Sequence, residues 1–321
     1  MNYKFIVSII VISALLIFQQ TSFEKSVYAA DQYEFKNQWG SKGLAHGQFM
    51  SPASIIVDSE DNVYVSDFSG RSNFIQKFSS NGTFLFGWGI LGYGPGSFVS
   101  PAGMAIDDEG NIYVADFGNA ETAVQKFLPN GTFVTSFGTF GYGPGQFVTP
   151  GGVSYDSGKI YVTDYGQNSK VVIFDTEGNF IDEFGGHGLG QGKFIRPTDT
   201  AVDSIGNIFV VDSGNDRIQK FDKDRNYLTE FGSSGSETGQ FEGPIEIFID
   251  EKDNIYVADT ENDRIQIFDR DGNFINAIGG IRGSDPGQFI DPISLSIDSE
   301  GNVYVTDGLN ARVQVFSPIS N

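Results

Sequence analysis

The sequence contains no cysteine, only two histidines, and about half as many basic as acidic residues. Without cysteine the fold can hold no disulfide and no thiolate metal site. The 20 Lys and Arg residues against 41 Asp and Glu residues give a formal net charge of −21 at pH 7. Nucleic-acid binding depends chiefly on basic side chains that neutralise phosphates, and the sequence shows no basic cluster, so we expect no nucleic-acid partner. The simplest explanation of the negative net charge is that it keeps the protein soluble.

Long hydrophobic runs are absent after the first residues of the chain. Residues 5–18 form an apolar run behind Lys4, and small residues at 27–29 precede Ala30, as at a signal-peptidase site. This run is short for a spanning helix, which needs about 20 residues. We predict a cleaved signal peptide at 1–29, the alternative being an uncleaved anchor. The mature chain is then expected to be secreted or at the cell surface, with no stable membrane insertion.

What the chain does contain is repetition. Residues 254–268 read NIYVADTENDRIQIF, and they recur as NVYVTDGLNARVQVF at 302–316 and as NIFVVDSGNDRIQKF at 207–221, with looser copies earlier. The Asp after the Y-V-x step marks each copy and returns every 47 to 49 residues, at Asp67, Asp116, Asp164, Asp212, Asp259 and Asp307. Six copies with a period near 48 are typical of a repeat architecture.

Each unit contains four segments of alternating polarity, bounded by Gly, Asn, Asp or Pro. A Pro opens the first segment, the marker Asp ends the second, and a Phe ends the third. This pattern predicts an all-β fold, a six-bladed β-propeller of four-stranded antiparallel blades over residues 31–321. We place the repeats at about 45–89, 94–138, 143–185, 190–232, 237–279 and 285–318.

The last unit ends after its third segment, whereas residues 33–40 align with the fourth segments of the other units. We therefore expect the N-terminal strand to complete the last blade and to close the ring without a disulfide. The repeated motif resembles the NHL repeat family, P-x-G-[IV]-A-[IV]-D followed by N-[IV]-Y-V-A-D-x-x-N-x-R-[IV]-Q-x-F. The resemblance covers nearly the whole chain after residue 31. It implies the propeller fold and, in different members, protein binding, RNA binding, ligand sensing or lyase chemistry.

The residue after the marker Asp divides the propeller into two halves. It is Ser213, Thr260 or Gly308 in the last three blades but aromatic in the first three, and matching loops before blades 2 and 3 add two tyrosines. Polar-tipped aromatic rings on loops are common contact residues, although packing between blades would explain them equally well. The predicted ligand-binding residues, on the face that carries the turns after second and fourth strands, are Phe68, Phe117, Tyr165, Tyr93 and Tyr142.

The second residue after each strand-opening Pro is small in four blades but is Asp199 or Glu246 in the other two. With Asp291, which precedes its Pro, these carboxylates form a candidate metal site at the channel mouth, and their oxygen ligands would favour Ca²⁺ or Mg²⁺. Alternatively, Arg196 pairs with Asp199 or Glu246 and neutralises the charge. Glu242 faintly resembles a metal-binding position in gluconolactonase-type propellers, whose other ligands are not recognisable here.

Other polar motifs have simpler explanations. The D-x-x-G-N turns suit hairpins better than a calcium loop. The marker Asp and the Arg five residues later recur in three blades, which favours an ion pair or cap that fixes a turn over catalysis. His46 and His187 occupy non-equivalent loop positions, so they predict no zinc site.

The sequence therefore predicts an extracellular binding or scaffold propeller that recognises a protein, peptide or glycan. The alternative is a metal-dependent lyase or lactonase-type hydrolase with its site at the channel mouth. Because no catalytic set stands out, we favour binding over enzymatic activity.

Overall fold

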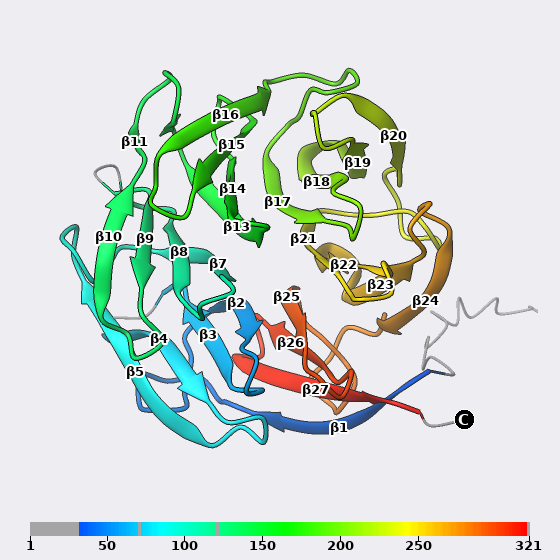
Figure 1. Cartoon of the computed structure of the whole chain (residues 1–321). Coiled ribbons are helices and arrows are strands. Elements are labelled where there is room, and N and C mark those ends of the chain that lie inside the picture. The colour runs from blue at the N-terminus through cyan, green and yellow to red at the C-terminus, as the bar shows by residue number, and fades with distance from the viewer. Residues whose placement is uncertain (1–31, 70–71, 120–121, 320–321) are drawn as a thin grey trace, which may run out of the picture.

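The computed structural model describes residues 32–69, 72–119 and 122–319. Within these residues six antiparallel sheets are arranged radially around a central axis (Figure 1), which confirms the predicted propeller. The predicted signal peptide lies outside the described residues. No helix in the described ranges is long and apolar enough to cross a membrane.

The first three blades follow one another around the ring, and each begins with its innermost strand. Blade 1 consists of β2 (Pro52–Val57), β3 (Val63–Asp67), β4 (Ser72–Phe78), β5 (Phe84–Leu91) and the short parallel β6 (Ser97–Phe98). Blade 2 consists of β7 (Pro101–Ile106), β8 (Ile112–Asp116), β9 (Val124–Phe127) and β10 (Phe133–Phe137), and the loop after it contains the parallel pair β11 (Thr139–Phe140) and β12 (Gln146–Phe147). Blade 3 consists of β13 (Pro150–Asp156), β14 (Lys159–Asp164), β15 (Lys170–Asp175) and β16 (Phe180–Gly185).

The last three blades repeat this order, with a 3₁₀ turn after the second strand in two of them. Blade 4 consists of β17 (Pro197–Val202), β18 (Ile208–Asp212), η1 (Ser213–Asn215), β19 (Arg217–Phe221) and β20 (Tyr227–Phe231). Blade 5 consists of β21 (Pro244–Ile249), β22 (Ile255–Asp259), η2 (Thr260–Asn262), β23 (Arg264–Phe268) and β24 (Phe274–Gly279). Blade 6 consists of β25 (Pro292–Ile297), β26 (Val303–Asp307), β27 (Arg312–Pro318) and the N-terminal β1 (Tyr33–Trp39).

The apolar core lies between neighbouring blades. Each second strand is buried along its length, apart from Lys159 at the start of β14, because both of its faces pack against an adjacent sheet. Between blades 6 and 1, for example, Tyr304 and Val313 pack against Ile55, Val63 and Phe49. Burial on two faces explains why the second segments read as continuous apolar runs, whereas the outer strands alternate.

The long loop between blades is fastened by a buried Phe and a Gly. Phe241 is fully buried, and a Cβ on Gly232, whose φ is +93°, would lie 2.4 Å from its ring. Gln266 of the third strand then binds both sides of the same loop, accepting from Gly239 N at 3.0 Å and donating to Gln240 O at 2.7 Å. The same Gln contacts occur in every blade except the third, where Val172 takes the place of the Gln.

Strand pairing closes the ring, as predicted. β1 runs antiparallel to β27, from Tyr33 opposite Pro318 to Trp39 opposite Val313. The Tyr33 hydroxyl also lies 2.9 Å from that of Tyr256 in blade 5. The first strand therefore contacts two blades.

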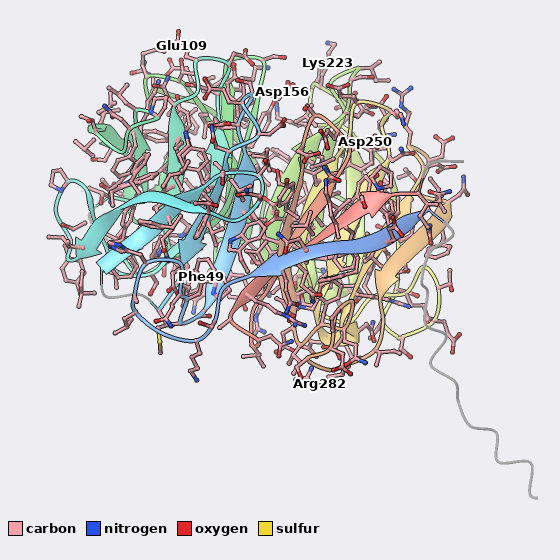
Figure 2. The ribbon with its side chains drawn as sticks, turned by 90° about the horizontal axis from the view of Figure 1, so that it is seen from below. Phe49, Glu109, Asp156, Lys223, Asp250 and Arg282 are labelled. Atoms are coloured by element: carbon pink, nitrogen blue, oxygen red, sulfur yellow. The ribbon has the colours of Figure 1, made fainter. Side chains whose placement is uncertain are left out.

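The turns fall on two faces. We call the face with the turns after first and third strands the bottom, and the face with the turns after second and fourth strands the top. In Figure 2 the bottom face points upward and carries Glu109, Asp156, Lys223 and Asp250, whereas Arg282 lies on the opposite, top face. The top face carries the inter-blade loops, so it can vary without disturbing the sheets.

Candidate functional site

A cavity of about 550 Å³ occupies the centre of the ring. The six innermost strands line it, and Phe68, Phe117 and Tyr165 line it from the top-face turns. Its volume is in the range of small-ligand sites, about 300–1,000 Å³. The cavity is the candidate functional site.

Three of the five predicted aromatic residues form a continuous wall at this cavity. The rings of Phe68 and Phe117 lie 5.7 Å apart, and those of Phe117 and Tyr165 are also 5.7 Å apart. Each residue follows a marker Asp, and its backbone N–H donates to the residue before the Pro that opens the same blade, for example Phe117 N to Ser100 O at 3.0 Å. The guanidinium of Arg196 lies 6.0 Å from the ring of Tyr165. These rings therefore pack across blades and also line the cavity, and their role as ligand contacts stays a prediction.

Tyr93 and Tyr142 are not part of this wall. They lie on the outer inter-blade loops, 59% and 64% exposed. The structure adds other exposed apolar residues that the sequence alone did not reveal. The exposed set on four consecutive loops and at the end of β5 is Leu44, Ile90, Leu91, Tyr93, Phe140, Tyr142 and Leu189. We call this set the apolar arc. Alignment on the glycine that ends each blade would have revealed it, because Leu44, Tyr93, Tyr142 and Leu189 each stand four residues after that glycine.

Each blade contributes one residue to a ring of positions around the cavity, the second residue after its Pro. We call these six positions the waist: Ser54, Gly103, Gly152, Asp199, Glu246 and Ser294. The strand ladder is interrupted at this point in every blade, between the Pro and the residue three positions later. Side chains of the waist accept hydrogen bonds from the backbone N–H groups that follow this irregularity in the next blade.

The waist side chains join neighbouring blades. Ser54 accepts a hydrogen bond from Met104 N of the next blade at 3.1 Å, and Ser294 accepts one from Ile55 N at 2.9 Å. Asp199 and Glu246 make the same contact in their blades, from Ile247 N and Leu295 N, both at 3.2 Å. At Gly152 a Cβ would lie 2.4 Å from the Asp199 Oδ1 atom, so the small residue leaves room for the carboxylate.

The two waist carboxyls have perturbed acidity. Asp199 is 8% exposed and Glu246 is partly buried. Both side chains line the cavity, so their remaining exposed surface faces it. Burial raises the pKa of Asp199 to about 8, although hydrogen bonds from backbone N–H groups lower this pKa to a smaller extent. Burial also raises the pKa of Glu246 well above its usual value, and the nearby Asp199 charge adds to this effect. Two carboxyls in one poorly hydrated site therefore resist being ionised together.

The third acid of the predicted metal site lies apart from the other two. Arg282 donates to Asp291 at 2.8 Å, and the same guanidinium bonds Asp263 at 2.9 Å. The φ of Asp291 is +55°, and that of Arg196, at the matching position of blade 4, is +52°. Residues before the Pro therefore adopt a left-handed conformation here, and neither one joins the waist carboxylates. Across the described ranges, no three His, Cys, Asp or Glu residues are grouped as a metal ion would require.

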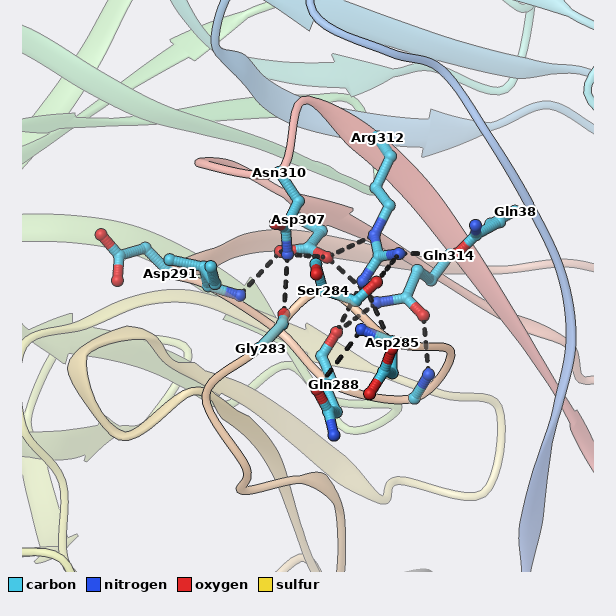
Figure 3. A network of polar contacts seen from close by, with 12 residues as sticks. Gln38, Gly283, Ser284, Asp285, Gln288, Asp291, Asp307, Asn310, Arg312 and Gln314 are labelled. Carbon is cyan, nitrogen blue, oxygen red and sulfur yellow. Dashed lines mark hydrogen bonds and ion pairs between the residues drawn. The ribbon is translucent and has the colours of Figure 1, made fainter.

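The marker Asp and its Arg form the predicted turn-fixing pair. In blade 6, Arg312 Nε donates to Asp307 at 2.7 Å while its other nitrogens bind loop carbonyls, and Asp307 accepts from Ile290 N at 2.8 Å (Figure 3). The same pair recurs as Asp212 with Arg217 and as Asp259 with Arg264. These groups hold the top-face turns in place and do not line the cavity.

The D-x-x-G-N turns of the bottom face and the two histidines also make contacts within the fold. Asp107 accepts hydrogen bonds from the backbone and side chain of Asn111, which is the predicted hairpin pattern. The exposed His46 ring stacks on Phe84 at 4.5 Å, and His187 lies beside Ser169 in another inter-blade loop.

Comparisons with known proteins agree with this architecture. A family model described as a 6-bladed beta-propeller matches residues 147–233 and 241–317, which together make up half of the chain, and the NHL repeat model matches residues 98–121. No curated protein matches the sequence.

Several solved structures share the fold at low identity. An auxiliary nutrient binding protein from Bacteroides thetaiotaomicron is 13% identical, with a TM-score of 0.63 over 85% of this chain and 70% of that one. A gluconolactonase from Xanthomonas campestris is 12% identical, with a TM-score of 0.65 over 91% and 96%. Virginiamycin B lyase from Staphylococcus aureus is 15% identical, with a TM-score of 0.59 over 89% and 100%. Both binding proteins and enzymes therefore have this shape.

Proposed function

Because the chain belongs to the 6-bladed beta-propeller family, a fold shared by binding proteins and enzymes, we propose from its own surface that it is a binding protein. Its ligand is a protein or peptide held by the top face of blades 1 to 3. The observation that carries this proposal is the aromatic wall of Phe68, Phe117 and Tyr165 at the central cavity. Large rigid rings at a concave site give contact area at a small entropy cost.

The apolar arc supports a protein or peptide over a glycan. Exposed apolar residues gathered on neighbouring loops are typical of interaction sites. Leu44 and Leu189 are 50% and 73% exposed, and their side chains offer no hydrogen bond to a sugar hydroxyl. A glycan ligand therefore has less support than a protein or peptide ligand. On the other half of the top face, the equivalent loop positions carry Ser236 and Ser284.

The test is selection of a random phage-displayed peptide library on the immobilised protein. Peptides enriched on the wild type should bind Phe117→Ala and Tyr165→Ala at least about tenfold more weakly, because each substitution removes a central ring. Leu228→Ala removes an exposed leucine from the outer strand of blade 4 and should leave binding unchanged. Selected peptides that bind both aromatic variants with wild-type affinity would remove the proposal.

An enzymatic function is the second candidate, and one observation favours it. The pKa values of Asp199 and Glu246 are raised, and perturbed acids in a cavity are typical of acid–base catalysis. The lyase and the lactonase of similar fold belong to the reaction classes predicted for a metal-dependent site. Metal analysis of the purified protein decides this point. A stoichiometric Ca²⁺ or Mg²⁺ ion that is lost in Asp199→Ala or Glu246→Ala would favour the enzyme.

We also propose an extracellular location, from the predicted signal peptide at 1–29. N-terminal sequencing of the protein recovered outside the cell should begin near Ala30. Protein retained in the cytoplasm with an intact N-terminus would contradict the proposal.

A further inference from the structure

The two sides of the central cavity differ in chemistry. Blades 1 to 3 present Phe68, Phe117 and Tyr165, whereas blades 4 and 5 present Asp199 and Glu246. The titratable side chains in the lining are these two acids with Tyr155 and Tyr165, and the lining contains no Lys or Arg. Arg196, which precedes the first strand of blade 4, is exposed and lies over the ring of Tyr165. Among the described residues, neither waist carboxyl takes part in an ion pair.

Other buried acids differ from this pair because each is neutralised by a base or lies outside the cavity lining. Asp212, Asp259 and Asp307 have an Arg within 2.8 Å. Asp107 and Asp203 have a Lys within 3.8 Å. Asp67, Asp116 and Asp164 have no ion pair, but they accept two or more backbone N–H bonds and lie outside the cavity lining. Asp199 is buried and Glu246 is partly buried, and both face the open volume of the cavity.

Joining the blades does not require an acid at these two positions. Serine makes the same inter-blade contact at Ser54 and Ser294 with a neutral hydroxyl. A buried carboxylate costs desolvation free energy that a hydroxyl does not. The inter-blade contact at the waist therefore does not explain why these two positions are acidic.

We propose that the cavity binds an organic cation, a primary ammonium on an apolar stem, with the ammonium between Asp199 and Glu246 and the stem against the aromatic wall. This inference rests on the proposed binding function and names the group that enters the cavity. An ammonium supplies three donors. The two carboxyls have acceptor lone pairs beyond those that accept from Ile247 N and Thr200 N at Asp199 and from Leu295 N and the Ser294 hydroxyl at Glu246. The rings opposite add a favourable surface for the stem and for the charge.

Binding of the cation is coupled to proton release. In the empty cavity, burial and mutual repulsion keep the carboxyl pair partly protonated. A bound ammonium favours the ionised pair, so a proton leaves to solvent when the cation binds. Affinity therefore rises with pH through the pKa of Asp199 and falls again only when the amine itself loses its proton.

The ammonium has two sources, a free small amine or the lysine side chain of a peptide, and titration calorimetry with defined probes separates them. The probes are 2-phenylethylammonium, its neutral analogue 2-phenylethanol, and a selected peptide with its lysines free or acetylated. The wild type should bind 2-phenylethylammonium at least tenfold more tightly than 2-phenylethanol, and the heat in two buffers of different ionisation enthalpy should show proton release. Loss of peptide affinity on acetylation identifies lysine as the source, and an unchanged peptide affinity with retained amine binding identifies a free amine.

The matched variants keep the fold and remove the charge. Asp199→Asn with Glu246→Gln retains an oxygen acceptor for each backbone N–H and should weaken the amine at least tenfold without changing 2-phenylethanol binding. Glu261→Gln, an exposed acid of blade 5 outside the cavity lining, should leave both unchanged. Equal affinity of the wild type for the two probes, or equal amine binding by the double variant, would overturn the inference.

The two proposals fail separately. In one outcome the selected peptides bind Phe117→Ala more weakly, but the wild type binds 2-phenylethylammonium and 2-phenylethanol equally. That outcome would support the binding function and contradict the cation site. In the opposite outcome amine binding depends on the charge of the two acids, but the peptides bind Phe117→Ala and Tyr165→Ala with wild-type affinity. That outcome would support the cation site and contradict the peptide-binding face.

Discussion

Each blade places a single side chain at the waist, and the size and charge of that side chain determine how the blade is joined to the next. Glycine at positions 103 and 152 lets neighbouring strands approach directly, since a Cβ there would lie within 2.6 Å of atoms of the next blade. Serine and the two acids instead bridge the gap with an oxygen. At Asp199 and Glu246 the bridge carries a titratable group into a poorly hydrated place, so stability depends on pH.

Asp199→Asn should reveal this dependence. Burial raises the pKa of Asp199 to about 8, above about 3.9 in an unfolded chain, so the folded protein binds more protons between these values. The free energy of unfolding of the wild type therefore falls as pH rises from about 4 to about 8, and the amide removes that loss. In urea unfolding, the stability gain of the variant over the wild type should increase by about 3–4 kcal/mol between pH 5 and pH 8, at about 1.4 kcal/mol for each pH unit.

The exposed acid Glu261 provides the control, because Glu261→Gln should give no pH-dependent gain. A constant difference between Asp199→Asn and the wild type at both pH values would contradict the raised pKa.

At the scale of elements, the inter-blade loop is the unit that adapts the top face without altering the sheets. Its two ends are fixed by the Gly and Phe contact and by the Gln bonds, as in the loop between Gly232 and Phe241. Between these points the side chains differ from loop to loop, from Tyr93 to Ser236. The exposed residues of the apolar arc therefore change with little effect on the fold, whereas the fixed ends do not tolerate change.

Gly232→Ala tests the fixed end of this loop. The new Cβ would lie 2.4 Å from the Phe241 ring at a φ of +93°, whereas Gly239→Ala in the same loop has a φ of +76° and no atom within 4 Å. Both variants bear the backbone strain, so their difference isolates the steric clash. Gly232→Ala should be less stable than Gly239→Ala by about 1–3 kcal/mol in chemical unfolding. Equal stabilities would show that the Phe241 ring moves aside freely.

At the scale of the whole molecule, one strand closes the ring. β1 covers the edge of β27 over its full length and reaches Tyr256 of blade 5. Without it, blade 6 would present a bare edge strand, and such edges pair with other chains. The closure also keeps blades 1 and 6 in register, and with them the six waist positions.

Removal of residues up to Gly40 should therefore open the propeller. We expect a lower thermal midpoint and concentration-dependent self-association, measured by calorimetry and light scattering. A chain that begins at residue 32 retains β1 and should behave as a monomer of unchanged midpoint. If the shorter chain unfolds at the same temperature and stays monomeric, the strand is not what holds the ring shut.

The sequence by itself determined the six blades, their strand order, the closure and the turn-fixing role of the Asp and Arg pairs, because these depend on hydrogen bonds and apolar periods within one repeat. Only the tertiary structure decided which repeated positions meet. Asp199 and Glu246 share the cavity, whereas Asp291 turns to Arg282 through a left-handed backbone, and Tyr93 and Tyr142 remain outside while Phe68, Phe117 and Tyr165 form one wall. The physical reason is that closeness across a ring depends on the direction of each side chain, and spacing along the chain does not encode that direction.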